Sequence, residues 1–121
     1  MELYQELGYY EDLLLKAITE LKDRGRKYAK AYKEYRMLLA KELLELRANE
    51  MPVTIAYDIA RGKEEIANAK EQEIITESLY KSCQEAINVY KLKIKILENQ
   101  INREYGVADK IWMIILYQYQ K

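Results

Sequence analysis

The sequence predicts an all-α protein, and three observations support this class. Apolar residues recur every three or four positions over two long stretches, which is the spacing of one face of a helix. Half of the 121 residues are hydrophobic and a third are charged, a balance typical of folded helical proteins. The single proline, Pro52, lies between the two stretches, where a helix has to end. We therefore expect a long antiparallel helical hairpin, coiled-coil-like, with a short connector helix.

The first arm of the hairpin is expected over residues 2–48. Its apolar stripe steps by three and four like a heptad repeat, apart from one interruption. The stripe consists of Leu3, Leu7, Tyr10, Leu14, Ala17, Leu21, Tyr28, Ala31, Tyr35 and Leu38. A second apolar row beside it, which includes Leu39 and Leu43, predicts that this helix contacts more than one partner. Gly25 interrupts the stripe, and we expect a kink or a short break there.

The connector is expected over residues 49–62, with a short helix from about Thr54 to Arg61. Pro52 stands before this helix because it lacks an N–H group and clashes with a preceding helical turn. Gly62 follows it, and we expect this glycine to close the helix in the left-handed conformation.

The second arm is expected over residues 63–105, and its stripe is more regular than the first. The stripe consists of Ile66, Ala69, Thr76, Tyr80, Cys83, Ile87, Tyr90, Ile94, Leu97 and Ile101, with a polar gap at Glu73. Gly106 is expected to end this arm.

The tail, residues 107–121, is rich in isoleucine, leucine and aromatic residues and nearly uncharged. It is compatible with a short helix or with a strand, because β-branched and aromatic residues favour strands. An exposed segment of this kind aggregates, so we expect it to pack on the bundle or to join an oligomer contact.

A two-helix hairpin of this length has almost no interior. Arms of about forty residues are ~60 Å long, and each helix covers only one side of the other. We therefore expect residues 1–121 to form a single helical domain that assembles into an oligomeric helical bundle, a dimer or a larger closed oligomer.

Composition excludes several classes of function. Lysine plus arginine equals aspartate plus glutamate, so the chain lacks the basic excess of proteins that coat nucleic acid. With no histidine, the usual catalytic triads and zinc sites are excluded. We expect a non-enzymatic protein with no cofactor and no metal.

The expected location is the cytoplasm. A single cysteine allows no disulfide within the chain, and residues 1–6 lack the basic start and apolar core of a secretion signal. The longest uncharged run, residues 111–120, is half of what a membrane helix needs, so no membrane partner is expected.

Seven polar residues are candidates for ligand binding: Arg24, Arg26, Lys27, Tyr32, Arg36, Arg61 and Asn88. The cations beside Gly25 form either an anion site or a solvated basic turn. Arg61 either binds an anion at the start of the second arm or belongs to a helix end. The Tyr32–Arg36 surface either stacks a nucleobase and holds its phosphate, or is a packed seam. Asn88 sets the register between helices, contacts solvent or binds a ligand, and the first two readings are favoured.

Several segments, in a fixed order, resemble a known family. They are Leu46-Arg47, Met51-Pro52-Val53-Thr54, Ala60-Arg61-Gly62, Tyr80-Lys81-Ser82, Glu85-Ala86-Ile87-Asn88 and residues 91–106. In these segments the chain resembles small helical proteins of unknown function encoded by temperate bacteriophages and prophages of Gram-positive bacteria. The resemblance covers roughly residues 20–106 and implies a viral protein in the host bacterial cytoplasm. It implies no catalytic residues.

These observations lead to three functional hypotheses. The first is a binding protein that counters bacterial antiviral defence by sequestering a nucleotide signal. The second is an accessory protein of phage DNA replication or recombination, which binds single-stranded DNA or a partner protein. The third is a structural or adaptor protein that inhibits a host protein by direct contact.

Overall fold

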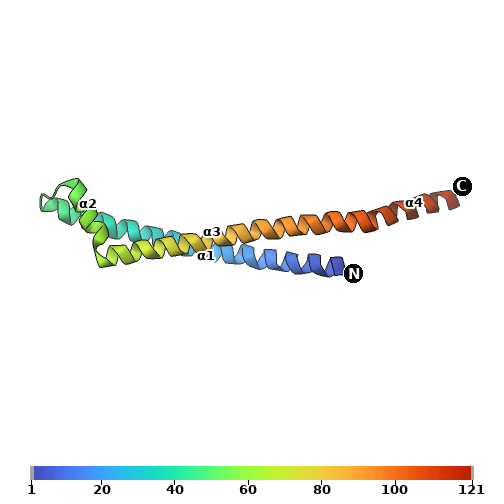
Figure 1. Cartoon of the computed structure of the whole chain (residues 1–121), viewed down its shortest axis with the longest axis horizontal. Coiled ribbons are helices and arrows are strands. Elements are labelled where there is room, and N and C mark those ends of the chain that lie inside the picture. The colour runs from blue at the N-terminus through green and yellow to red at the C-terminus, as the bar shows by residue number, and fades with distance from the viewer. Residues whose placement is uncertain (1, 121) are drawn as a thin grey trace. The chain divides into compact units, whose positions relative to one another are not determined.

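The computed structural model describes residues 2–120, apart from the side chains of residues 107–110. It contains α1 (Glu2–Ala48), α2 (Val53–Gly62), α3 (Glu64–Ile101), a π-helical turn (Asn102–Gly106) and α4 (Val107–Tyr119), as Figure 1 shows. The predicted all-α class is confirmed, and the described residues contain no strand. None of their helices combines the length and the apolar character that a membrane crossing requires.

The chain divides into two compact units, which are described separately below. Unit 1 consists of Met1–Ile18 and Glu85–Lys121, and unit 2 consists of Thr19–Gln84. Helices α1 and α3 each contribute to both units. That residues 1–121 behave as a single domain stays a prediction.

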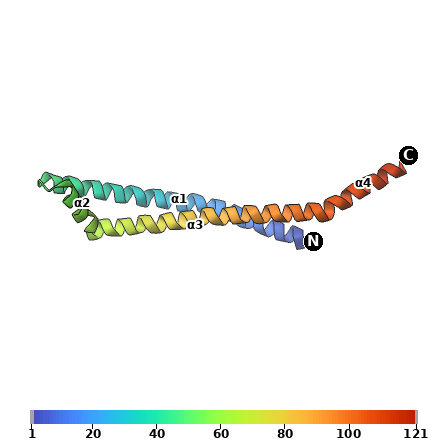
Figure 2. The ribbon, with the colours of Figure 1, turned by 45° about the horizontal axis from the view of Figure 1, so that its top comes forward.

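Unit 2 is an antiparallel hairpin of α1 and α3, closed by α2. Residues 24–28 of α1 contact residues 79–80 of α3, whereas Glu42, nearer the end of α1, contacts Lys63, just before α3 begins. Arg24 donates a hydrogen bond to the Leu79 carbonyl at 2.8 Å, and the rings of Tyr28 and Tyr80 lie 6.1 Å apart. Further along α1, the Glu42 carboxylate forms an ion pair with Lys63. The two helices lie side by side in each view, including Figure 2.

The seam of unit 2 is built from the predicted stripes. Ala31 of α1 and Ile66, Thr76 and Cys83 of α3 are buried, and so is Leu39 from the second apolar row. The buried Thr76 hydroxyl is satisfied because it donates to main-chain carbonyls of the preceding turn, at 2.8 and 3.0 Å. These positions follow from period alone, because a heptad repeat keeps one face towards its neighbour.

Gly25 does not break α1, which runs through it as continuous helix. Glycine at this position lets the Tyr80 ring of α3 lie close to the backbone of α1. A Cβ atom built at this position would lie 3.2 Å from Cε2 of Tyr80, closer than ordinary van der Waals contact. The glycine interrupts the apolar stripe because the Tyr80 ring fills the space of its missing side chain.

The end of α1 is a Schellman motif. The Met51 N–H donates to the Leu46 carbonyl at 3.3 Å, and the Glu50 N–H donates to the Arg47 carbonyl at 3.0 Å. Glu50 occupies the left-handed position, with φ of 61°. Among the described residues it is the one non-glycine residue with positive φ. The Arg47 guanidinium supports the turn by donating to the Met51 carbonyl at 3.0 Å.

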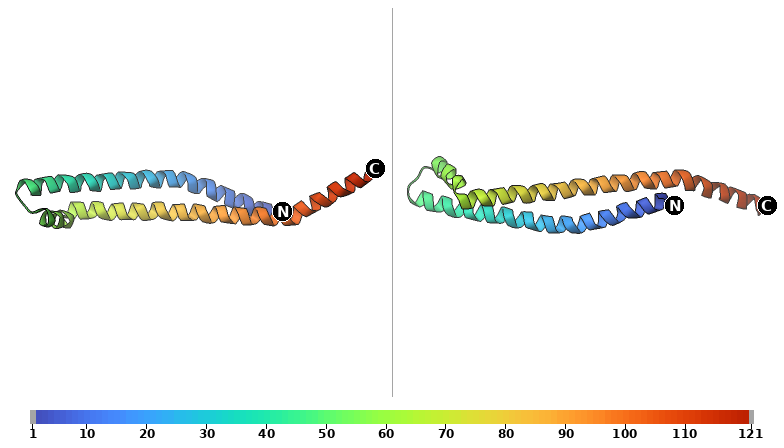
Figure 3. Two further views of the ribbon diagram at one scale, coloured as in Figure 1. Left: turned by 90° about the horizontal axis from the view of Figure 1, so that it is seen from above. Right: turned by 60° about the horizontal axis from the view of Figure 1, so that its bottom comes forward.

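Helix α2 covers the closed end of the unit 2 hairpin, between the end of α1 and the start of α3 (Figure 3). Its small residues Ala56 and Ala60, one turn apart, are completely buried. Ala60 joins Leu39 and Ile66 in a core cluster that draws on all three helices. Alanine at these positions lets the backbone of α2 approach its neighbours closely.

The expectation that Gly62 closes the connector helix in the left-handed conformation is wrong, since no described glycine has positive φ. Gly62 is the last residue of α2, and Lys63 follows it in an extended conformation, φ −69° and ψ 138°. One extended residue is enough to turn the chain into α3, so no reversal at glycine is required.

Unit 1 is a second antiparallel pairing of α1 with α3. The rings of Tyr10 and Tyr90 lie 6.4 Å apart, and those of Tyr4 and Tyr105 lie 5.8 Å apart. The buried residues of this unit belong to the predicted stripes: Ala17, Ile87, Leu97 and Ile101.

Gly106 does not end the second arm as predicted. Beyond Ile101 the backbone passes through the π-helical turn, and Gly106 itself has α-helical angles, φ −65° and ψ −36°. The chain continues as α4, so the tail is a helix and not a strand. Residues 111–120 are all exposed, so within a single chain they are not buried by the rest of unit 1.

Candidate functional site: a tyrosine-lined groove

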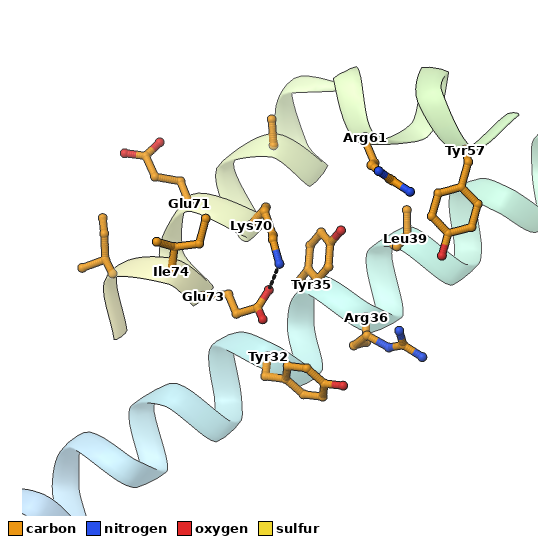
Figure 4. Close-up of a pocket in the computed structure, with 12 residues that line it drawn as sticks. Tyr32, Tyr35, Arg36, Leu39, Tyr57, Arg61, Lys70, Glu71, Glu73 and Ile74 are labelled. Carbon is orange, nitrogen blue, oxygen red and sulfur yellow. Dashed lines mark hydrogen bonds and ion pairs between the residues drawn. The ribbon is translucent and has the colours of Figure 1, made fainter. Parts of the chain in front are cut away.

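Unit 2 contains a groove of about 730 Å³ on one side of the hairpin. Helix α1 contributes Tyr32, Tyr35, Arg36 and Leu39, and α2 contributes Tyr57 and Arg61. Helix α3 contributes Ala67, Lys70, Glu71, Glu73, Ile74 and Ile75. Figure 4 shows these side chains around the groove. The volume lies within the ~300–1,000 Å³ that is typical of small-molecule sites.

Two tyrosine–arginine pairs with the same spacing line this groove. Tyr32 and Arg36 are one turn apart on α1, and Tyr57 and Arg61 are one turn apart on α2. The Arg61 guanidinium carbon lies 4.5 Å from the centre of the Tyr57 ring, a cation–π contact. A spacing of four places both side chains on one helix face, so each pair presents a ring beside a cation.

The arginines of both pairs are exposed and available to an anion. Neither Arg36 nor Arg61 forms an ion pair with another residue between 2 and 120. A guanidinium offers several N–H donors in a planar fork that fits phosphate or carboxylate oxygens. Tyr32 is 47% exposed, which leaves much of its surface open to a planar ligand.

The α3 wall of the groove carries a cation that is already neutralised. Lys70 forms an ion pair of 3.0 Å with Glu73, whose side chain is buried. The hydrogen bond to Glu73 raises the pKa of Lys70, so the lysine stays protonated. Its ammonium also lies 4.8 Å from the centre of the Tyr35 ring. In Figure 4, Tyr35 rises from α1 between Lys70 and Arg61.

Three of the seven predicted site residues, Tyr32, Arg36 and Arg61, therefore meet in one groove. The basic residues around Gly25 lie outside it. Arg24 binds the Glu20 carboxylate at 2.5 Å as well as the Leu79 carbonyl, so this arginine holds α1 to α3. Lys27 pairs with Asp23 at 3.1 Å. These two contacts match the solvated basic turn better than an anion site.

Arg26 and Asn88 also lie outside the groove. Arg26 is exposed on α1 in unit 2. Asn88 is exposed on α3 in unit 1, so it does not sit in the buried seam where it would set the register between α1 and α3.

Tyr57 and Lys70 also line the groove, although neither is among the seven predicted site residues. Both come from helices whose placement against α1 is a tertiary property, which local periodicity does not determine. One signal was available for Tyr57, since Tyr57-x-x-x-Arg61 repeats the spacing of Tyr32-x-x-x-Arg36.

Comparison of the chain with protein-family models, with curated proteins and with solved structures finds no match.

Proposed function

We propose that the protein is a non-enzymatic binding protein whose unit 2 groove holds a nucleotide. The observation that carries this proposal is the presence of two tyrosine–arginine pairs in one groove. A nucleotide presents a flat base and an anionic phosphate side by side. Stacking on a tyrosine and a charge-assisted hydrogen bond from an arginine match these two features.

The duplication of the pair narrows the ligand class. Each pair takes one base and one phosphate, so two pairs fit a ligand that carries two bases and two phosphates. Cyclic dinucleotides have this composition. We therefore expect them to bind more tightly than mononucleotides, which engage one pair only.

The groove favours binding over chemistry. The chain has no histidine, the side chain used most often for proton transfer near neutral pH. The buried carboxylate of the groove, Glu73, is paired with Lys70. The accessible polar groups are Arg36, Arg61 and the tyrosines, with the exposed carboxylate of Glu71 at the α3 side, and we propose that they recognise a ligand without activating it.

The biological role we propose follows from this ligand class and from the resemblance to temperate-phage proteins. A phage protein that sequesters a cyclic nucleotide in the host cytoplasm removes a signal that bacterial antiviral defence uses. Sequestration requires tight binding and no turnover, which agrees with a groove that lacks an acid–base pair.

A thermal-shift screen tests the proposal. The full-length chain is heated with mononucleotides, cyclic mononucleotides, cyclic dinucleotides and ADP-ribose derivatives, each at several concentrations. A ligand present at 100 times its Kd stabilises the folded state by about 2.7 kcal/mol. At ~4 °C per kcal/mol for a chain of this size, the midpoint rises by roughly 10 °C.

Two variants locate the site. Tyr32→Ala removes a groove ring, and Tyr9→Ala removes an exposed tyrosine of α1 outside the groove. Loss of one stacked base weakens binding by roughly 5- to 150-fold. We expect this loss in Tyr32→Ala and not in Tyr9→Ala. A flat screen with well-folded protein would contradict the proposal, and so would equal ligand shifts in the two variants.

A further inference from the structure

One segment of α4, residues 111–117, is apolar around the whole circumference of the helix. Residues 111–117 read Ile-Trp-Met-Ile-Ile-Leu-Tyr, and the three residues after them are Gln118, Tyr119 and Gln120. Successive residues of a helix point about 100° apart, so seven consecutive apolar residues cover every direction. Residues 111–120 contain no charged side chain.

These side chains are exposed in the single chain. Their exposed fractions run from 39% for Ile115 to 86% for Tyr119, and Trp112 is 62% exposed. With ~200 Å² for an aromatic side chain and ~100 Å² for an aliphatic one, α4 exposes roughly 700 Å² of apolar surface. Helices that are apolar on all sides are found buried, so this surface requires a cover.

The length and composition of α4 argue against a lipid cover. Its 13 residues make a helix of about 20 Å, against ~30 Å for the hydrocarbon core of a bilayer. Helices that lie in the membrane surface carry a strongly charged face, and residues 111–120 have none. A charged protein partner would likewise find no complementary side chain among these residues.

We propose that α4 is the self-association element of the chain and packs against the α4 helices of other copies. Each copy contributes roughly 700 Å² of apolar surface, close to the ~800 Å² per partner of a stable interface, and all of it is buried only when several neighbours share it. The uncharged segment, residues 111–120, is also compatible with its own copy, because no like charges meet when two such segments come together. One neighbouring helix covers only one side of α4. Each α4 therefore contacts more than one neighbouring helix, and the assembly is larger than a dimer.

The test uses the one tryptophan of the chain as a reporter, since Trp112 lies in α4 itself. Mass by sedimentation and Trp112 emission are measured on the full-length chain over a dilution series. We expect an oligomer with blue-shifted emission at high concentration, and a red shift as the complex dissociates on dilution.

The decisive variant is Ile114→Lys, which places a charge on α4 at a side chain that is 61% exposed. Lysine is a better helix former than isoleucine, and unchanged far-UV circular dichroism confirms that the fold is intact. The matched control is Leu44→Lys, at a 73% exposed side chain of α1 in unit 2. We expect Ile114→Lys to raise the midpoint concentration of dissociation by roughly 10-fold or more, and Leu44→Lys to leave it unchanged.

Three results would overturn the proposal. The first is an oligomer that both lysine variants leave unchanged. The second is a monomeric chain whose Trp112 emission is blue-shifted at every dilution, because α4 then folds back on its own chain. The third is a monomeric chain with exposed Trp112, whether or not it binds phosphatidylcholine vesicles, and vesicle binding would assign α4 to lipid. The groove lies in unit 2 and α4 in unit 1, so failure here leaves the ligand screen unaffected.

Discussion

Alanine at Gly25 should not give the stabilisation that it ordinarily brings to a helix interior, and a larger side chain at this position should destabilise the hairpin. A Gly→Ala change inside a helix gains about 0.5–1 kcal/mol. At Gly25 the new Cβ would lie 3.2 Å from Cε2 and 3.7 Å from Cδ2 of Tyr80. The ring must shift by a few tenths of an ångström, towards or away from Tyr28, whose ring centre lies 6.1 Å away. We expect this shift to cancel most of the gain.

Gly8 provides the matched control, because it lies in the same helix and a Cβ there meets no atom within 4 Å. Gly8→Ala should raise the thermal midpoint by roughly 2–4 °C, at ~4 °C per kcal/mol. Gly25→Ala should stay within about 2 °C of the wild type. Gly25→Leu should lower the midpoint by roughly 4–12 °C, the usual cost of overpacking.

Thermal melts followed by far-UV circular dichroism measure these differences. The double variant Gly25→Leu with Tyr80→Ala should recover part of the loss of Gly25→Leu, because removing the ring opens the space. A Gly25→Leu variant that melts at or above the wild-type temperature would refute the assignment of Gly25 to close packing.

Three further predictions concern the turn and the core of unit 2. Leu39→Ala should lower the free energy of unfolding, measured by chemical denaturation, by about 2–5 kcal/mol, because Leu39 is 4% exposed and packs on Ala60. A loss below ~1 kcal/mol would contradict the place of Leu39 in the core. Glu50→Gly should raise the free energy of unfolding by about 1 kcal/mol, because glycine adopts the left-handed conformation at φ 61° without strain. An unchanged free energy of unfolding would argue against the Schellman turn. The hydrogen bond to Glu42 raises the pKa of Lys63, so its stabilisation is present below pH ~10.4 and disappears as pH rises through the raised pKa. Melting temperatures between pH 9 and 12 should therefore fall less steeply for Glu42→Gln than for the wild type, and identical slopes would contradict this linkage.

The helical seam was predictable because its information is local. A heptad repeat determines which face of a helix is buried, and Ile66, Cys83 and Leu97 are buried at positions of the predicted stripe. Glu73, at the polar gap in that stripe, is buried as well, since Lys70 neutralises its charge. A charged residue can therefore occupy a buried position of the stripe when a residue of opposite charge lies one turn away.

The helix ends were harder to predict. Glycine is the usual left-handed residue, so Gly62 and Gly106 were expected to close helices. The left-handed residue after α1 is instead Glu50, held by the paired hydrogen bonds of the turn. Composition did not reveal this, because a carboxylate side chain adopts that conformation only where surrounding contacts compensate the strain.

The groove was predictable only in part, because some of its residues share one helix and others come from different helices. Tyr32 and Arg36 lie on the same face of one helix, and their spacing of four residues predicted this pairing. The opposing pair, Tyr57 and Arg61, comes from α2, whose position depends on the close approach of Ala60 to the core. Local sequence does not determine which helices contact each other. The repeated Tyr-x-x-x-Arg spacing was the one sequence signal that indicated the second pair.

In the proposed complex, the arginines of the two pairs bind the phosphates of one ligand. Isothermal titration of a cyclic dinucleotide into the wild type, the double variant Arg36→Gln/Arg61→Gln and the control Arg26→Gln tests it most directly. A hydrogen bond to a charged group contributes about 1.5–3 kcal/mol, so we expect the double variant to bind at least ~100-fold more weakly. Arg26→Gln, at an exposed cation outside the groove, should bind like the wild type. Equal affinity of the double variant and the wild type, or no binding to the wild type, would contradict the account.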